Sequence, residues 1–85
     1  MRDTRYAKEN LTARLTLGDG SEARIENIFV KATGQDEIRF SWWKNENIVP
    51  RALDLNEGDL LQLLERGIAA GIFSNTFRDS LRQVL

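Results

Sequence analysis

Cysteine and histidine are both absent from this chain of 85 residues. Without cysteine there is no disulfide, thiol nucleophile or thiolate metal site, and a small secreted domain usually depends on disulfides. Without histidine the chain lacks the commonest general base and the commonest transition-metal ligand. These absences favour a reducing, cytoplasmic setting and a protein that is not an enzyme. Chemistry that uses carboxylates alone stays open.

A strong net charge and long apolar runs are missing as well. The formal net charge is −1 at pH 7, so no global field attracts nucleic acid or a membrane surface. No apolar run approaches the length of a membrane span, and residues 1–10 lack the apolar core of a signal peptide. Hydrophobic residues make up 41% and charged residues 29%, as in ordinary soluble proteins. We therefore expect one soluble domain over residues 1–85, without a membrane partner.

Alternating apolar and polar residues predict a sheet over residues 10–53. The first strand begins at Leu11, "GDGS" at 18–21 is a turn, and residues 22–32 form the return strand. A three-residue loop over 19–21 would pair Leu15 with Ile25 and Arg14 with Glu26, which keeps apolar side chains together on one face. Residues 1–9 are predicted to be frayed, with Tyr6 as their only anchor.

A third strand is predicted at 37–44 and a fourth at 48–53. Pro50 cannot donate a ladder hydrogen bond, so the fourth strand should lie at an edge. Pairing Phe29 with Ile38 would bring Ile25 opposite Trp42. Trp42 is therefore predicted to be the buried tryptophan.

From residue 56 onward, the spacing of the apolar residues changes from every second position to every third or fourth, which is typical of helices. Asn56 is a suitable N-cap and Gly71 a suitable left-handed end for a first helix. Its predicted apolar stripe is Leu60, Leu61, Leu64 and Ile68, with Leu63 beside it. Ser74 should cap a second helix over 75–84, whose inward residues would be Phe77, Leu81, Val84 and Leu85. The predicted fold class is α+β: a four-stranded antiparallel β-meander followed by an αα-hairpin (56–85) packed on one face.

Motifs of catalysis and ligand binding are absent. The chain has no GxSxG, Walker or GxGxxG pattern. The carboxylates of "DLNEGD" at 54–59 lack the spacing of a calcium loop and are explained by helix capping. We predict no catalytic residue, cofactor, metal or small-molecule ligand.

The helical segment 57–85 is also compatible with a degenerate helix-turn-helix. Gly67 and Gly71 fit that motif, whereas Arg66 and Ser80 occupy places that should be apolar. The second helix would offer only a weakly basic surface, and DNA binding rests on Lys and Arg. A helical hairpin packed on the sheet is favoured. The stretches "PRALDL" (50–55) and "LLERGIAAGIFS" (63–74) resemble the tails of small phage-related bacterial proteins, and no activity or site residue follows from that resemblance.

The adjacent tryptophans point to opposite faces of a strand, so Trp43 should lie on the face away from the helices. That outer face gathers the residues we predict to bind a partner: Trp43, Ile28, Val30, Arg24 and Arg39. Three interpretations are open. Residues 1–10 cover the face, a protein docks there, or Trp43 stacks a base of single-stranded nucleic acid while arginines hold phosphates. We favour a non-enzymatic protein-interaction module, with self-association as a homodimer included and nucleic acid as the alternative.

Overall fold

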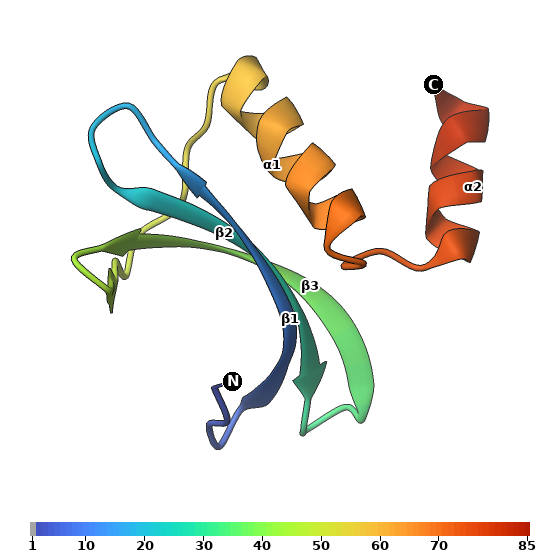
Figure 1. The fold of residues 1–85 in the computed structure, drawn as a ribbon. Helices are drawn as coiled ribbons and strands as arrows, with labels where there is room; N and C mark the ends of the chain where they lie inside the picture. The colour runs from blue at the N-terminus through green and yellow to red at the C-terminus, as the bar shows by residue number, and fades with distance from the viewer. Residues whose placement is uncertain (1) are drawn as a thin grey trace.

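The structure is a computed structural model that describes residues 2–85. One antiparallel sheet contains, in chain order, β1 (Ala7–Thr16), β2 (Glu22–Val30), β3 (Gln35–Lys44) and β4 (Asn47–Ile48). Two helices follow, α1 (Glu57–Ala69) and α2 (Asn75–Val84) (Figure 1). The predicted α+β class, with a four-stranded antiparallel meander preceding two helices, is confirmed.

The hairpin between β1 and β2 has its loop one position earlier than predicted. Leu17 N donates to Ser21 O at 2.8 Å, so the loop is residues 18–20, with Gly20 at φ 85°. The pairing is therefore Leu15 with Ala23 and Ala13 with Ile25. The predicted pairs of Leu15 with Ile25 and Arg14 with Glu26 are wrong by two residues. A shift of two leaves every side chain on its predicted face, because side chains alternate with period two.

The pairing of β2 with β3 is shifted in the same way. Ile25 lies opposite Phe40 and Phe29 opposite Asp36, rather than opposite Trp42 and Ile38. The two faces again keep their predicted members. We call the face under α1 the inner face and the opposite one the outer face.

The amino-terminal segment is paired into the sheet and is longer in strand than predicted. β1 begins at Ala7 and passes through an irregularity between Glu9 and Leu11, where an extra residue bends the strand. Residues 2–6 turn back as an arm: Thr4 N donates to Ala7 O, and Glu9 N donates to Arg2 O. The expected frayed segment is thus hydrogen-bonded. Tyr6, its predicted anchor, is exposed.

The fourth strand is only two residues long instead of spanning 48–53. It follows a tight turn in which Asn45 and Glu46 both have positive φ, as in a type I′ hairpin. Val49 N still donates to Trp42 O, and the ladder stops at Pro50, which has no N–H to donate.

Helix α1 begins and ends as predicted, but it buries a different stripe. The Asn56 side chain accepts from Asp59 N at 2.7 Å, and Gly71 has φ 78° beyond the last turn. The buried residues of α1 are Leu63 and Gly67, whereas most of the predicted stripe (Leu60, Leu61 and Ile68) is exposed. The predicted stripe is wrong because the close approach of α1 to the sheet occurs at Gly67. A Cβ there would lie 3.3 Å from the Ile25 side chain.

Helix α2 stands apart from the rest of the chain (Figure 1). Ser74 caps it as predicted, accepting from Phe77 N at 3.1 Å. No residue of α2 is buried, and α2 makes no close backbone approach to the sheet or to α1. The prediction that Phe77, Leu81, Val84 and Leu85 face inward is wrong, since all four are exposed.

Candidate functional site

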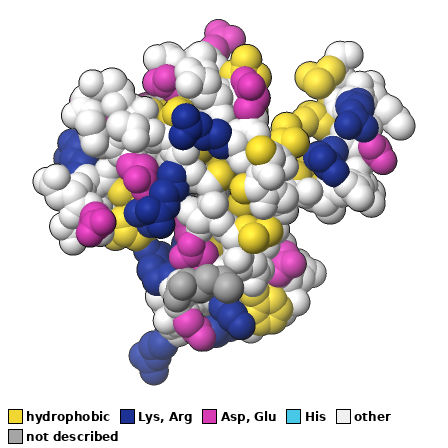
Figure 2. Space-filling model, viewed as in Figure 1, with side chains coloured by type: hydrophobic (Ala, Val, Ile, Leu, Met, Phe, Trp, Pro, Cys, Tyr) yellow, Lys and Arg dark blue, Asp and Glu magenta, His cyan; other side chains and the backbone are white. Residues whose placement is uncertain are grey.

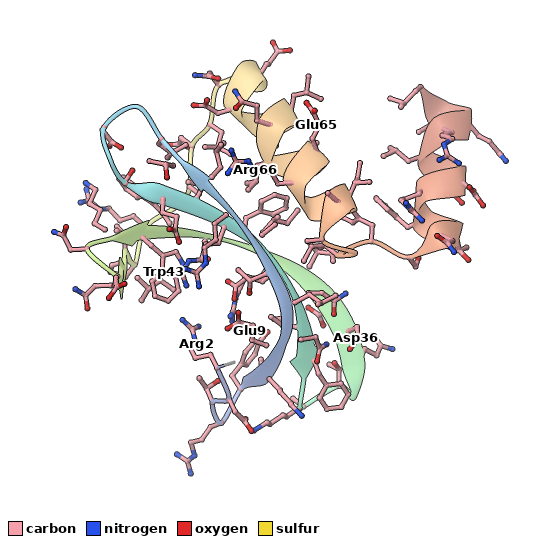
Figure 3. All side chains as sticks on the ribbon, in the orientation of Figure 1. Arg2, Glu9, Asp36, Trp43, Glu65 and Arg66 are labelled. Carbon is pink, nitrogen blue, oxygen red and sulfur yellow. The ribbon has the colours of Figure 1, made fainter. Side chains whose placement is uncertain are left out.

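The predicted partner-binding residues Trp43, Ile28, Val30, Arg24 and Arg39 all come from the outer-face positions of β2 and β3. All five are buried or half-buried. Trp43 is 7% exposed, Ile28 and Val30 are buried in a small cluster with Ala7, and the two arginines are half-buried. The bent sheet curls around this face, and Figure 3 shows Trp43, Glu9 and Arg2 inside the bend, opposite α1. Their role in partner binding stays a prediction.

The roles of the two tryptophans are reversed relative to the prediction. Trp42 is only half-buried on the inner face, where its Nε1 donates to Ser21 Oγ at 2.9 Å and the Lys44 ammonium lies 4.4 Å from its ring centroid. Helix α1 lies over β1 and β2 and does not reach β3. Trp42 therefore lacks the helical cover that the predicted packing would have provided.

Two arginines cover the ring of Trp43. The guanidinium carbon of Arg24 lies 3.8 Å from the ring centroid, and that of Arg2 lies 5.0 Å away. Arg24 thus makes a cation–π contact with Trp43, although Glu22 is the residue directly opposite Trp43. Arg2 comes from the arm, so the chain covers its own outer face, as one of the three interpretations expected.

A continuous hydrogen-bond chain runs across the outer face behind that ring. Trp43 Nε1 donates to Ser41 Oγ at 2.8 Å, and Ser41 Oγ donates to Glu26 Oε1 at 2.9 Å. Arg39 Nη2 donates to the other carboxylate oxygen at 3.1 Å. Glu26 is only 1% exposed, so its charge is balanced by Arg39 rather than by water. We call these four residues the outer-face network.

The arm is fixed by carboxylates with lowered pKa values. Burial alone would raise the pKa of Glu9, but hydrogen bonds from the Thr12 hydroxyl and from Arg2 N outweigh it and hold the pKa below its ordinary value. A hydrogen bond and an ion pair with Lys31 lower the pKa of Asp3. Both carboxylates therefore stabilise the hydrogen-bonded arm while they are ionised. This stabilisation is lost as the pH falls through their lowered pKa values.

The inner face carries an uncovered apolar surface instead. Helix α1 approaches only β1 and β2, and Leu53, Leu55 and Phe73 add cover over the same core cluster, so the part of the face beyond this cluster is left open. Phe40 is 47% exposed in the middle of β3. We call this surface the open face, and its exposed apolar side chains are Leu11, Phe29, Ile38 and Phe40.

Helix α2 presents a second uncovered apolar surface. Phe77, Leu81 and Val84 recur at helical spacing on one side of the helix, and Phe77 is 48% exposed. We call these three residues the α2 stripe. The only aromatic contact of the stripe is the stack of Phe77 on Phe73, with ring centroids 5.2 Å apart. Figure 2 shows hydrophobic side chains gathered where the α2 lobe joins the body.

A hollow adjoins the open face at the start of α1. It has a volume of about 460 Å³ and is lined by Phe40, Leu53, Asp54, Leu55 and Leu60. Four of these five residues are apolar, and Asp54 supplies the only charge. The hollow extends the open face toward the exposed leucines of α1.

Acidic side chains are the candidate metal ligands in this chain, because histidine and cysteine are absent. Residues 2–85 contain no cluster of three or more acidic side chains that could hold a metal ion. The buried carboxylate of Glu26 is occupied by Ser41 and Arg39. Over the same residues, no helix is both long enough and apolar enough to cross a membrane.

The helix-turn-helix alternative is not supported by the helix arrangement, since that motif requires two helices packed together, and α1 and α2 do not approach each other closely.

No protein-family model, curated protein or solved structure matches this chain.

Sequence reasoning missed the open face and the α2 stripe as candidate contact surfaces. The residues themselves were recognised as apolar, and the helix bounds were right. No local signal in the sequence distinguishes an amphipathic helix that packs on its own sheet from one that does not.

Proposed function

We propose that this protein is a non-enzymatic protein-interaction module whose contact surface combines the open face with the α2 stripe. The observation that carries the proposal is a strongly amphipathic helix without a buried residue, in a chain whose inner sheet face is only partly covered. Soluble monomers rarely expose contiguous apolar patches larger than a few hundred Å², and larger ones mark contact sites.

The outer face is a weaker contact surface than the sequence suggested. A partner that used Trp43 would first have to displace Arg2 and Arg24 from its ring. It would also have to break the hydrogen bonds that fix the arm at Glu9. The open face and the α2 stripe require no such displacement.

Site-specific photo-cross-linking in the cells that produce the protein tests this proposal. A photoreactive phenylalanine analogue in place of Phe77 should yield a covalent protein adduct, whether with another protein or with a second copy. The same analogue in place of Thr16, exposed on the outer face, is the matched control and should yield little adduct. Equal yields at both positions, or no adduct at position 77, would contradict the proposal.

A further inference from the structure

We infer that the occupant of the contact surface is a second copy of this chain, with α2 of each copy seated on the open face of the other. This inference rests on the proposed function and names its partner. The chain carries an apolar helix stripe that packs on no sheet, the α2 stripe, and an apolar sheet surface that no helix covers, the open face. A single two-fold axis would therefore cover both surfaces in both copies at once, as isologous dimers do.

The start of α2 is held in a way that keeps it from its own open face. Ile72, just before the helix, is buried, and its carbonyl accepts from Asn27 Nδ2 at 3.1 Å. Phe73 is half-buried and stacks on Phe77, which fixes the first turn. Rotating α2 about Ser74 onto its own β3 would break the stack of Phe77 on Phe73. A second copy can reach the open face while this stack stays in place.

The charges around the two surfaces have opposite signs. Helix α1 carries Glu57, Asp59 and Glu65 against the single Arg66. Two more carboxylates, Asp36 and Asp54, border the open face and its hollow, and Lys8, opposite Phe29, reduces this acidic excess without cancelling it. Figure 3 shows Glu65 on the side of α1 toward α2.

Helix α2 has the opposite excess, with Arg78 and Arg82 against Asp79, which pairs with Arg82 at 2.8 Å and leaves Arg78 as the excess charge. Its basic side chains would therefore meet an acidic border on the other copy, which favours this pairing over like-charged contacts.

The available area matches what a stable dimer buries. A standard interface covers about 800 Å² on each partner. The open face and the α2 stripe together contain seven exposed apolar side chains. If each leaves roughly 100 Å² uncovered, they offer on the order of 700 Å², which is close to that area.

Cross-linking between engineered cysteines tests the inference, and the absence of native cysteine removes any background. A Val84→Cys chain and an Ile38→Cys chain are mixed and treated with a short thiol-reactive cross-linker. If α2 of each copy is seated on the open face of the other, a covalent heterodimer that joins positions 84 and 38 should form. Thr16→Cys replaces Ile38→Cys as the matched control and should give at least tenfold less heterodimer.

The double variant Val84→Cys/Ile38→Cys distinguishes the remaining outcomes. A cross-link within single chains, without heterodimer in the mixture, would overturn the inference by showing that α2 closes on its own sheet. The absence of both cross-links, together with a position-77 adduct to a different protein, would overturn the inference and leave the proposed function standing. The absence of all adducts would overturn both.

Discussion

At the scale of single residues, burial on the outer face is decided by the outer-face network and by the arm. Trp43 was correctly placed on that face from the alternation of β3, yet its burial could not be read from the sequence. Burial follows from the bend at the irregularity before Leu11, which brings Arg2 over the ring. A one-residue irregularity of this kind has no reliable sequence signature, so the sequence left open what covers Trp43.

Glu26→Gln should lower the free energy of unfolding by about 2–3 kcal/mol. Glu26 is buried, and removing its charge leaves Arg39 without its counter-charge. Glu37→Gln is the matched control, because it removes the same charge from an exposed residue of the same face. It should change stability by less than about 0.5 kcal/mol. Urea denaturation followed by circular dichroism measures both, and equal effects would show that the network is not a stabilising unit.

At the scale of elements, helix boundaries were easier to predict than strand registers and packing partners. Asn56 and Ser74 cap their helices as expected, because capping depends on residues only three positions apart. The strand registers and the stripe of α1 depend on loops and on distant contacts. Both registers were therefore wrong by two residues, although the alternation kept every side chain on its correct face.

Gly67→Val should destabilise the fold by about 1–3 kcal/mol, since overpacking a tight contact costs this much. A Cβ at Gly67 would lie 3.3 Å from side-chain carbons of both Ile25 and Phe73. Gly58→Val in the same helix is the control, because a Cβ there meets only Asn56 Oδ1 at 3.4 Å. Thermal unfolding should show a clear loss for position 67 and a change within about 1 kcal/mol for position 58. Similar losses at both positions would contradict the close approach of α1 to the sheet.

At the scale of the whole molecule, the chain covers the outer face of its sheet and leaves part of the inner face exposed. Its arm and bent strands cover the outer face, where the sequence predicted a binding surface. Helix α2 does not pack on the inner face, where the sequence predicted that both helices would cover the core. The fold class was predictable from periodicity, and the contact surface was not, because its location depends on where α2 points relative to β3.

Light scattering at increasing protein concentration gives the molecular mass in solution and tests α2-mediated self-association most directly. We expect the wild-type chain to approach twice its mass of 9.7 kDa as concentration rises. Leu81→Glu, which places a charge in the α2 stripe, should remain at the mass of one chain with unchanged circular dichroism. Gln83→Glu adds the same charge on another side of the helix, because Gln83 is not three or four residues from any member of the stripe, and this variant should still dimerise. A wild-type chain that stays monomeric up to about 1 mM, or a Leu81→Glu variant that dimerises equally well, would contradict α2-mediated self-association.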